Sequence, residues 1–314
     1  MELQMASGPM LAVCPNPAWQ KTLIFQKLQP GAVNRACCVS ECGGGKGINV
    51  ARVLRNLGFP VAVAGFIGGD PGRHLYEELQ QSGAGDFTVA CQNPTRCCYT
   101  IVDNATAQAT ELIEPSGLIA PAEVAAQLNL LRAHISEFSA VCLSGTLPPG
   151  VAPKFYAQIA ALARSAGIPV LLDAYRDIAQ TLAEGICMLK INAGELRTLS
   201  GKKELRCGAE QILSSFPLSW LAVTDGAATA WLFNRQESWC FTIPLLAKVV
   251  SPIGAGDCAA AILLRRLTEK PAAEKMPAFF AEALACASAS CLTAFPSAFH
   301  PEEAEKIRSE ILIS

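Results

Sequence analysis

Short, almost wholly apolar runs alternate along the chain with longer segments in which apolar residues recur every three or four positions. The short runs are typical of strands buried on both faces, and the longer segments of amphipathic helices. Strands that alternate with helices predict βαβ units, and therefore a mostly parallel sheet with helices on both faces. The predicted strands cover residues 10–14, 61–67, 87–91, 140–143, 169–172, 188–191 and 220–223, and the predicted helices residues 46–57, 71–82, 121–136, 153–166 and 259–264.

Two segments interrupt this alternation because they contain strand-like runs with no helix between them. The runs are residues 22–25, 36–39 and 97–102, and we expect them to pair antiparallel. We interpret segments 22–42 and 95–112 as a small β-sheet lid over the carboxyl edge of the main sheet. Ordinary surface hairpins are the alternative. The α/β core then contains the rest of the chain, residues 1–21, 43–94 and 113–314.

Composition and charge exclude several classes of protein. Of the 314 residues, 51% are apolar and 17% are charged, which is enough apolar material for a large core. The net charge of −2 lacks the basic excess of a nucleic-acid-binding protein. The first nine residues show no signal peptide, and the apolar stretch 276–295, which contains Glu282, is better explained as a buried helix than as a membrane span. We therefore expect a cytoplasmic protein without nucleic-acid or membrane partners.

The 14 cysteines fit neither a metal site nor a disulfide framework. No Cys-x-x-Cys pair occurs, and the spacing of the three histidines matches no zinc motif. A chain of this length does not need disulfides to stabilise its core. We interpret the cysteines as reduced thiols that behave as small hydrophobic residues.

The strongest chemical motif is Pro-Ile-Gly-Ala-Gly-Asp at residues 252–257, directly before a predicted helix. Unpaired backbone N–H groups of Gly254, Ala255 and Gly256, together with the helix dipole, would favour a phosphate. A carboxylate beside a phosphate site is better suited to accept a proton from an attacking hydroxyl than to bind the anion, so Asp257 is a candidate base. The letters Gly-Ala-Gly-Asp recur at residues 83–86, but there they end a helix, and we expect no anion site.

A second glycine-rich segment, Cys-Gly-Gly-Gly-Lys-Gly-Ile-Asn at residues 42–49, opens the predicted helix 46–57. It is not a Walker A loop, because no Ser or Thr follows the lysine. Its glycines permit close backbone approach to a ligand, and Lys46 and Asn49 add a cation and an amide at the same place. We predict a polar, anionic ligand here; a flexible loop is the alternative.

Two further motifs follow predicted strands. Asn192 and Glu195 would lie side by side if a helix begins there, and an amide and a carboxylate oxygen are suitable Mg²⁺ ligands. A helix-capping pair is the alternative, and this motif alone favours it. Ser144 lies in Leu-Ser-Gly-Thr-Leu-Pro-Pro-Gly, residues 143–150, at a strand end where open α/β sheets bind ligands. A rigid proline turn is the alternative there.

Together these motifs resemble the signatures of the PfkB family of ribokinase-like carbohydrate kinases. They occur in family order between about residues 11 and 294. The resemblance implies a three-layer α/β/α core with a β lid, and transfer of the γ-phosphoryl group of ATP to a hydroxyl. It makes Asp257 the base and residues 254–256 the group that stabilises the transferred phosphoryl. Asn192 and Glu195 would place Mg²⁺.

Segments 16–18, 30–35, 95–96 and 143–150 resemble the 1-phosphofructokinase and tagatose-6-phosphate kinase branch of this family. That resemblance implies a sugar phosphate as acceptor, for example fructose 1-phosphate converted to fructose 1,6-bisphosphate. It also implies a homodimer formed through the lid, whose edges a second copy would cover. By the same resemblance, the acceptor contacts Gln20, Gly44, Gly45, Lys46, Asn49, Arg96 and Ser144, and the nucleotide contacts Thr224, Gly226, Gly254 and Gly256.

The chain departs from this branch at two positions near the acceptor. Gln20 stands where the branch usually has aspartate, and Cys97-Cys98-Tyr99-Thr100 replaces a stretch that usually contains asparagine and lysine. These changes leave open a kinase of an unphosphorylated sugar or nucleoside. A non-catalytic, metabolite-sensing protein is a further alternative, although the intact Asp257 motif argues against it.

Overall fold

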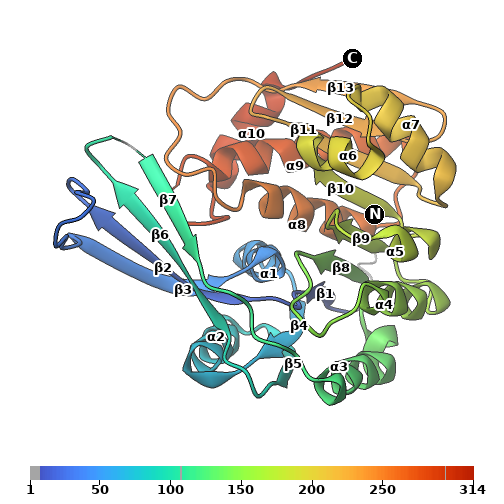
Figure 1. The fold of residues 1–314 in the computed structure, drawn as a ribbon. Helices are drawn as coiled ribbons and strands as arrows, with labels where there is room; N and C mark the ends of the chain where they lie inside the picture. The colour runs from blue at the N-terminus through green and yellow to red at the C-terminus, as the bar shows by residue number, and fades with distance from the viewer. Residues whose placement is uncertain (1–7, 107, 294) are drawn as a thin grey trace.

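The computed structural model describes residues 8–106, 108–293 and 295–314, so part of the segment on which the signal-peptide expectation depends lies outside it. A ten-stranded sheet with the order β14-β13-β12-β11-β10-β9-β8-β1-β4-β5 crosses the molecule (Figure 1). Its parallel strands are β1 (Met10–Val13), β4 (Val61–Ile67), β5 (Gly85–Ala90), β8 (Ala140–Ser144), β9 (Val170–Asp173), β10 (Met188–Asn192) and β11 (Trp220–Asp225). The antiparallel extension, which the apolar pattern did not reveal, is β12 (Thr229–Phe233), β13 (Ser238–Thr242) and β14 (Leu312–Ile313).

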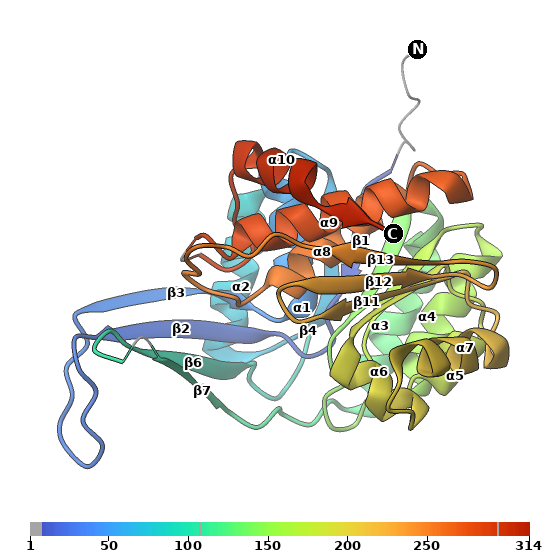
Figure 2. The same cartoon turned by 90° about the horizontal axis from the view of Figure 1, so that it is seen from above.

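Helices cover both faces of this sheet (Figure 2). Successive strand residues point to opposite faces, so Ala12 belongs to one apolar core and Leu11 to the other. One face is covered by α1 (Lys46–Asn56), α2 (Gly69–Ser82), α8 (Ala255–Leu267), α9 (Met276–Ser290) and α10 (Pro301–Glu310). The other is covered by α3 (Pro121–His134), α4 (Lys154–Ser165), α5 (Ala179–Ala183), α6 (Ala193–Ser200) and α7 (Leu205–Ser215). The predicted three-layer α/β/α architecture is confirmed.

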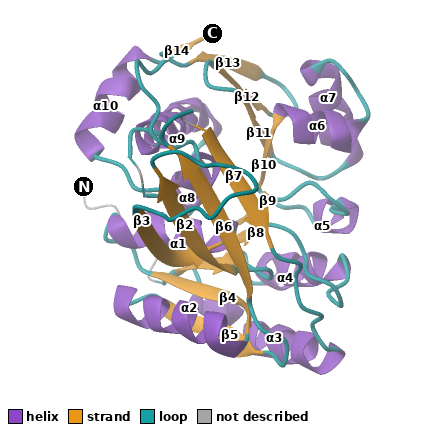
Figure 3. Ribbon diagram, turned by 60° about the vertical axis from the view of Figure 1, so that its left-hand side comes forward, coloured by secondary structure: helices purple, strands orange, loops and turns teal. Residues whose placement is uncertain are grey.

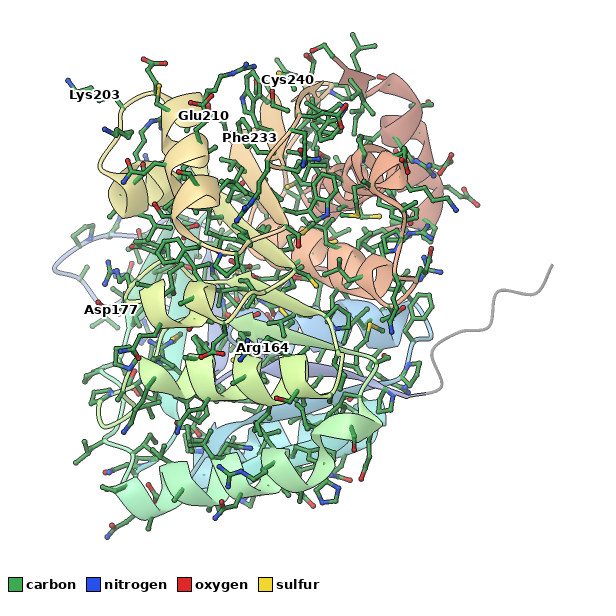
Figure 4. All side chains as sticks on the ribbon, turned by 90° about the vertical axis from the view of Figure 1, so that its right-hand side faces the viewer. Arg164, Asp177, Lys203, Glu210, Phe233 and Cys240 are labelled. Carbon is green, nitrogen blue, oxygen red and sulfur yellow. The ribbon has the colours of Figure 1, made fainter. Side chains whose placement is uncertain are left out.

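The outer surfaces of these helices are polar. Arg164 of α4 and Glu210 of α7 are exposed, whereas the opposite faces of both helices pack on the sheet (Figure 4). Two short 3₁₀ helices, Ile135–Glu137 and Ala273–Lys275, flank α3 and α9. Residues 276–290 of the apolar stretch predicted to be a buried helix form α9, which ends five residues before the predicted end. No helix among the described residues is long and apolar enough to span a membrane.

A second, four-stranded sheet with the order β3-β2-β6-β7 projects from one side of the core (Figure 1) and is turned toward the viewer in Figure 3. Its strands are β2 (Ala18–Phe25), β3 (Cys38–Gly44), β6 (Arg96–Asp103) and β7 (Gln108–Ile113), and we call it the small sheet. The β2–β3 hairpin is antiparallel, as expected. β6 also pairs antiparallel, but with β7, a strand that the sequence pattern did not predict.

The expectation of antiparallel pairing is wrong for the two central strands of the small sheet. β2 and β6 pair in parallel, with Ala18 beside Arg96 and Phe25 beside Asp103. The reason is topological: β2 follows β1 and β6 follows β5, two parallel strands of the main sheet that point toward the same edge. The segments that contain β2 and β6 therefore leave the core in the same direction. Each segment returns to the core as the second strand of its hairpin, β3 or β7.

Candidate active site

A cavity of about 920 Å³ opens at the carboxyl edge of the main sheet, beside the small sheet. Parallel strands bring all their carboxyl ends to one edge, so motifs far apart in the sequence meet there. The small sheet contributes Arg96, Glu111 and Ile113 to the wall. The predicted site residues in the wall are Gly45, Lys46, Arg96, Ser144, Asn192, Glu195, Thr224, Gly254, Gly256 and Asp257.

Asp257 lies in the first turn of α8 and is 8% exposed. Gly254 caps this helix in the left-handed conformation, with φ of 82°, where a side chain would be strained and would collide with Ser297. Gly254 and Gly256 line the cavity, as expected for a phosphate site. Ala255 is not in the cavity wall. The prediction that its N–H is unpaired is wrong, because this N–H closes a turn by donating to the carbonyl of Pro252 at 3.3 Å.

Asn49 does not line the cavity but contacts Asp257 directly. Its Nδ2 donates to Asp257 Oδ2 at 2.7 Å, and the Asn49 side chain is buried between α1 and α8. The sequence placed Asn49 near a ligand, whereas the structure places it against the candidate base. A buried amide in this position can fix which carboxylate oxygen of Asp257 remains free.

A buried carboxylate, Asp173, lies between two lysines at the floor of the cavity. Its Oδ1 accepts from Lys46 Nζ at 2.8 Å and its Oδ2 from Lys190 Nζ at 3.2 Å. Burial alone would raise the pKa of Asp173, but the two ammonium groups outweigh it and hold the pKa below its usual value. Sequence reasoning missed both Asp173 and Lys190. The available signals were a lysine inside the apolar strand 188–191 and an aspartate directly after strand 169–172.

The pKa of Asp257 is raised to about 6. Burial is the main cause, and the negative charge of Asp173 adds to it. The hydrogen bond from Asn49 and the charges of Lys190 and Lys46 act in the opposite direction. Asp257 is therefore a carboxylate near neutral pH, but a more basic one than an ordinary aspartate.

Asn192 and Glu195 form the capping box that the sequence offered as the alternative to a metal pair. Asn192 Oδ1 accepts from the Glu195 N–H, and Glu195 Oε2 from the Asn192 N–H, both at 2.9 Å. Glu195 Oε1 remains outside the box, 4.0 Å from Lys46 Nζ. Among the described residues no group of three or more His, Cys, Asp or Glu side chains could hold a metal. One carboxylate nevertheless fits Mg²⁺, which takes most of its ligands from water and nucleotide phosphates.

Gln20 and Thr100, which lie at the two departures from the sugar-phosphate branch, are hydrogen-bonded to each other. Gln20 Nε2 donates to Thr100 Oγ1 at 3.1 Å across the parallel β2–β6 pair. Gln20 also lies close over Gly44, where an added Cβ would meet its Oε1 at 3.0 Å. Neither Gln20 nor Gly44 is in the cavity wall. The two departures therefore form one polar contact within the small sheet.

Arg96, Ser144 and Thr224 reach the cavity, whereas Gly226 does not. The Arg96 guanidinium donates from NH2 to the carbonyl of Asn16 at 3.3 Å, and its Nε is buried with no acceptor among the described residues. Ser144 Oγ lies 2.8 Å from the Sγ of Cys142. Gly226, with φ of 72°, occupies the tight turn between β11 and β12.

Several solved structures share this fold. Phosphofructokinase-2 from Escherichia coli superposes with a TM-score of 0.85 at 23% identity, covering 96% of this chain and 99% of that chain. A possible 1-phosphofructokinase from Thermotoga maritima gives 0.85 at 22% identity, covering 97% and 98%. Ribokinase from Arabidopsis thaliana, solved with ribose and ATP, gives 0.74 at 19% identity, covering 96% and 99%. These likenesses establish a ribokinase-like fold.

The family follows from a sequence comparison. The model of the pfkB family carbohydrate kinases matches residues 14–300, which include both glycine-rich motifs and the whole cavity wall. Members of this family use ATP to phosphorylate an alcohol group of a sugar. This chain therefore belongs to the pfkB family of carbohydrate kinases.

Proposed function

We propose that this kinase transfers the γ-phosphoryl group of ATP to a hydroxyl of a sugar phosphate, in the manner of a 1-phosphofructokinase or a tagatose-6-phosphate kinase. The observation that carries the proposal is the buried Asp257 at the start of α8, oriented by Asn49 and facing a cavity that also contains Lys46 and Arg96. A base, an anion-binding helix start and cations in one cavity are what phosphoryl transfer requires.

Asp257 would accept the proton of the attacking hydroxyl while the start of α8 stabilises the transferred phosphoryl group. Lys46 and Lys190, which both form ion pairs with Asp173, add positive charge to the wall of the same cavity. Bound Mg²⁺ would neutralise charge on the nucleotide phosphates. Asn192 and Glu195 are the residues that would hold the ion, Glu195 through Oε1, the oxygen outside the capping box. Thr224, at the end of β11, would contact the nucleotide.

Arg96 supports a phosphorylated acceptor. Its guanidinium lies in the cavity wall with a buried, unpartnered Nε–H in the described structure, and a phosphate is a natural acceptor for such a group. The Gln20–Thr100 pair favours the second candidate, a kinase of a neutral sugar or nucleoside, because these two residues replace a carboxylate and a cation of the branch.

ADP formation with ATP and Mg²⁺ tests the proposal across a panel of acceptors. The panel contains fructose 1-phosphate, fructose 6-phosphate, tagatose 6-phosphate, ribose, fructose and a nucleoside. We expect turnover with a sugar phosphate. Turnover restricted to a neutral acceptor would support the second candidate, and ATP and sugar binding without any turnover would support a metabolite sensor.

Arg96→Gln separates the two kinase candidates. If Arg96 binds the acceptor's phosphate, the variant should raise the KM for that acceptor about 10- to 100-fold, the loss of one charge-assisted contact, and leave the KM for ATP unchanged. The measurement is initial rate against each substrate in turn. An unchanged KM for the acceptor would mean that Arg96 does not bind the acceptor's phosphate.

The pH dependence of turnover should report Asp257. Because its pKa is raised to about 6 and the carboxylate form accepts the proton, kcat should rise with pH through that region and level off above it. Rates at saturating ATP and acceptor between pH 5 and 8 (about one pH unit below and two above the inflection) would show this. A profile that stays flat down to pH 5 would contradict the assignment of Asp257 as base.

The small sheet supports a homodimer. β3 and β7 are both edges of the sheet, and they expose Val39, Leu112 and Ile113. Apolar side chains on open strand edges favour pairing with a second copy. We expect a dimer in light scattering after gel filtration, and Leu112→Lys should shift it toward monomer. A monomeric wild-type protein would refute this arrangement.

A further inference from the structure

The helices α1 and α2 both lie beside β3 (Figure 1). An ion pair joins the two helices near the end of this strand. Arg52 of α1 contacts Glu78 of α2, with 2.8 Å between NH2 and Oε1. Both side chains also bind the backbone of Gly43: Glu78 Oε2 accepts its N–H, and Arg52 NH2 donates to its carbonyl. β3 is an edge strand, so these outward groups of Gly43 have no neighbouring strand. Arg52 and Glu78 supply the hydrogen-bond partners that a neighbouring strand would otherwise give to the Gly43 backbone.

Gly43 is packed closely against the side chains of both helices. An added Cβ would lie 2.5 Å from Leu75 Cδ1 and 3.2 Å from Ile48 Cγ2. The first distance is far shorter than ordinary van der Waals contact and the second somewhat shorter, so a side chain here would displace Leu75. The end of β3 is therefore fixed against α1 and α2 by two charged side chains and by close packing.

The same arginine also sets the orientation of Asn49. Arg52 NH1 donates to Asn49 Oδ1 at 2.7 Å, and Asn49 Nδ2 donates to Asp257 Oδ2 at 2.7 Å. An amide has one acceptor end and one donor end. If the Asn49 amide were reversed, its NH₂ would face the guanidinium and its oxygen would face the carboxylate. Arg52 therefore determines that Asn49 presents a donor to Asp257.

We infer that Arg52 and Glu78 are positioning residues that link the small sheet to the reacting carboxylate, through Gly43 on one side and Asn49 on the other. This inference rests on the proposed role of Asp257 as base. The Arg52 side chain is 12% exposed and contacts Gly43, Glu78 and Asn49 at once. A displacement of β3 moves the guanidinium, and with it the amide that orients Asp257. The position of the small sheet thereby controls whether the base is correctly placed.

A double-mutant cycle tests the link to Asp257. Arg52→Gln should lower kcat about 10- to 100-fold, the effect of a misplaced catalytic group, with little change in the KM for ATP. If Arg52 acts through Asn49, the Arg52→Gln/Asn49→Ala variant should be no slower than Asn49→Ala alone. If the losses of kcat in the two single variants instead multiply in the double variant, the inference is overturned. Should Arg52→Gln not fold, Arg52→Lys serves instead, because an ammonium cannot supply the fork that reaches Gly43, Glu78 and Asn49.

Arg55→Gln is the matched control. Arg55 lies one turn further along α1, and its Nε also joins α1 to the end of α2 by donating to the Ser82 carbonyl at 2.8 Å. In the described structure it makes no hydrogen bond or ion pair with Gly43 or Asn49. We expect Arg55→Gln to keep the wild-type kcat. Equal losses of kcat in Arg55→Gln and Arg52→Gln would indicate a general effect of the α1–α2 contact and would overturn the inference.

Hydrogen exchange tests the link to β3 without requiring turnover. The Gly43 amide should exchange at least about 10-fold faster in Glu78→Gln and Arg52→Gln than in Arg55→Gln, because its charged acceptor is lost or released. Unchanged exchange would overturn the inference. If the wild-type protein phosphorylates no acceptor, the proposed function fails, and the exchange of Gly43 still decides whether the pair holds the small sheet.

Discussion

Asp257→Asn is expected to lose nearly all phosphoryl transfer while ATP binding persists. The substitution keeps the size of the side chain but removes the proton acceptor, and removal of a general base typically costs about 10²- to 10⁴-fold in rate. The nucleotide contacts expected at Thr224 and Gly254 are not altered. Turnover by ADP formation and ATP binding by calorimetry would be measured on the same preparation. Unchanged turnover would refute the role of Asp257.

The stability of this variant provides an independent check. The folded-state pKa of Asp257, about 6, lies above the reference value of 3.8, so ionisation in the folded state costs stability as the pH rises through that interval. The neutral asparagine has no such cost and no repulsion from Asp173. Asp257→Asn should therefore melt at the same or a higher temperature than the wild type at neutral pH. A lower melting temperature would mean that lost turnover reflects damage to the fold.

The chain offers its own control for this substitution. Asp86 ends the second copy of Gly-Ala-Gly-Asp, where Gly83 caps the end of α2 with φ of 70° and β5 begins at Gly85. Asp86 is exposed and accepts from the Thr88 N–H and hydroxyl. Asp86→Asn should keep the wild-type turnover. Only the copy that opens a helix is expected to be catalytic.

Local patterns predicted the elements that depend on neighbouring residues alone. The turn before α8, the end of α2 at Gly83 and the Asn192–Glu195 pair are set by residues within a few positions of one another. Glycine placement and helix-capping chemistry are sufficient to recognise such sites. The sequence also indicated the parallel sheet, because strands buried on both faces are continuous apolar runs.

Contacts between distant segments were not predictable in this way. The parallel pairing of β2 with β6 joins residues about 78 positions apart, as between Ala18 and Arg96. Lys46 reaches Asp173 across 127 positions, and Asn49 reaches Asp257 across 208. The glycine-rich segment predicts a ligand loop, yet Gly43 and Gly44 extend β3 where it packs closely on its neighbours. In each case the fold, and not the local sequence, brings the residues together.

Asp173→Asn should be the most destabilising single change in the site. It leaves the ammonium of Lys190, whose side chain is 6% exposed, buried without its counter-charge, and breaking such a pair typically costs about 3–5 kcal/mol. Lys46, at 36% exposed, can still reach solvent. Urea unfolding at neutral pH would measure the loss. The Asp173→Asn/Lys190→Met variant is the control, because removing both charges should recover much of the stability.

The pH dependence distinguishes loss of this charge from loss of packing. Because the two lysines lower the pKa of Asp173 below 3.8, its ion pairs stabilise the fold fully above that pH, and the contribution disappears as the pH falls toward the folded-state pKa. In acid the wild-type carboxyl becomes neutral, as asparagine is at every pH. The difference in unfolding free energy between wild type and Asp173→Asn should therefore narrow as the pH is lowered. A difference that is independent of pH would mean that asparagine disturbs the packing around β9, and that the two ion pairs contribute little.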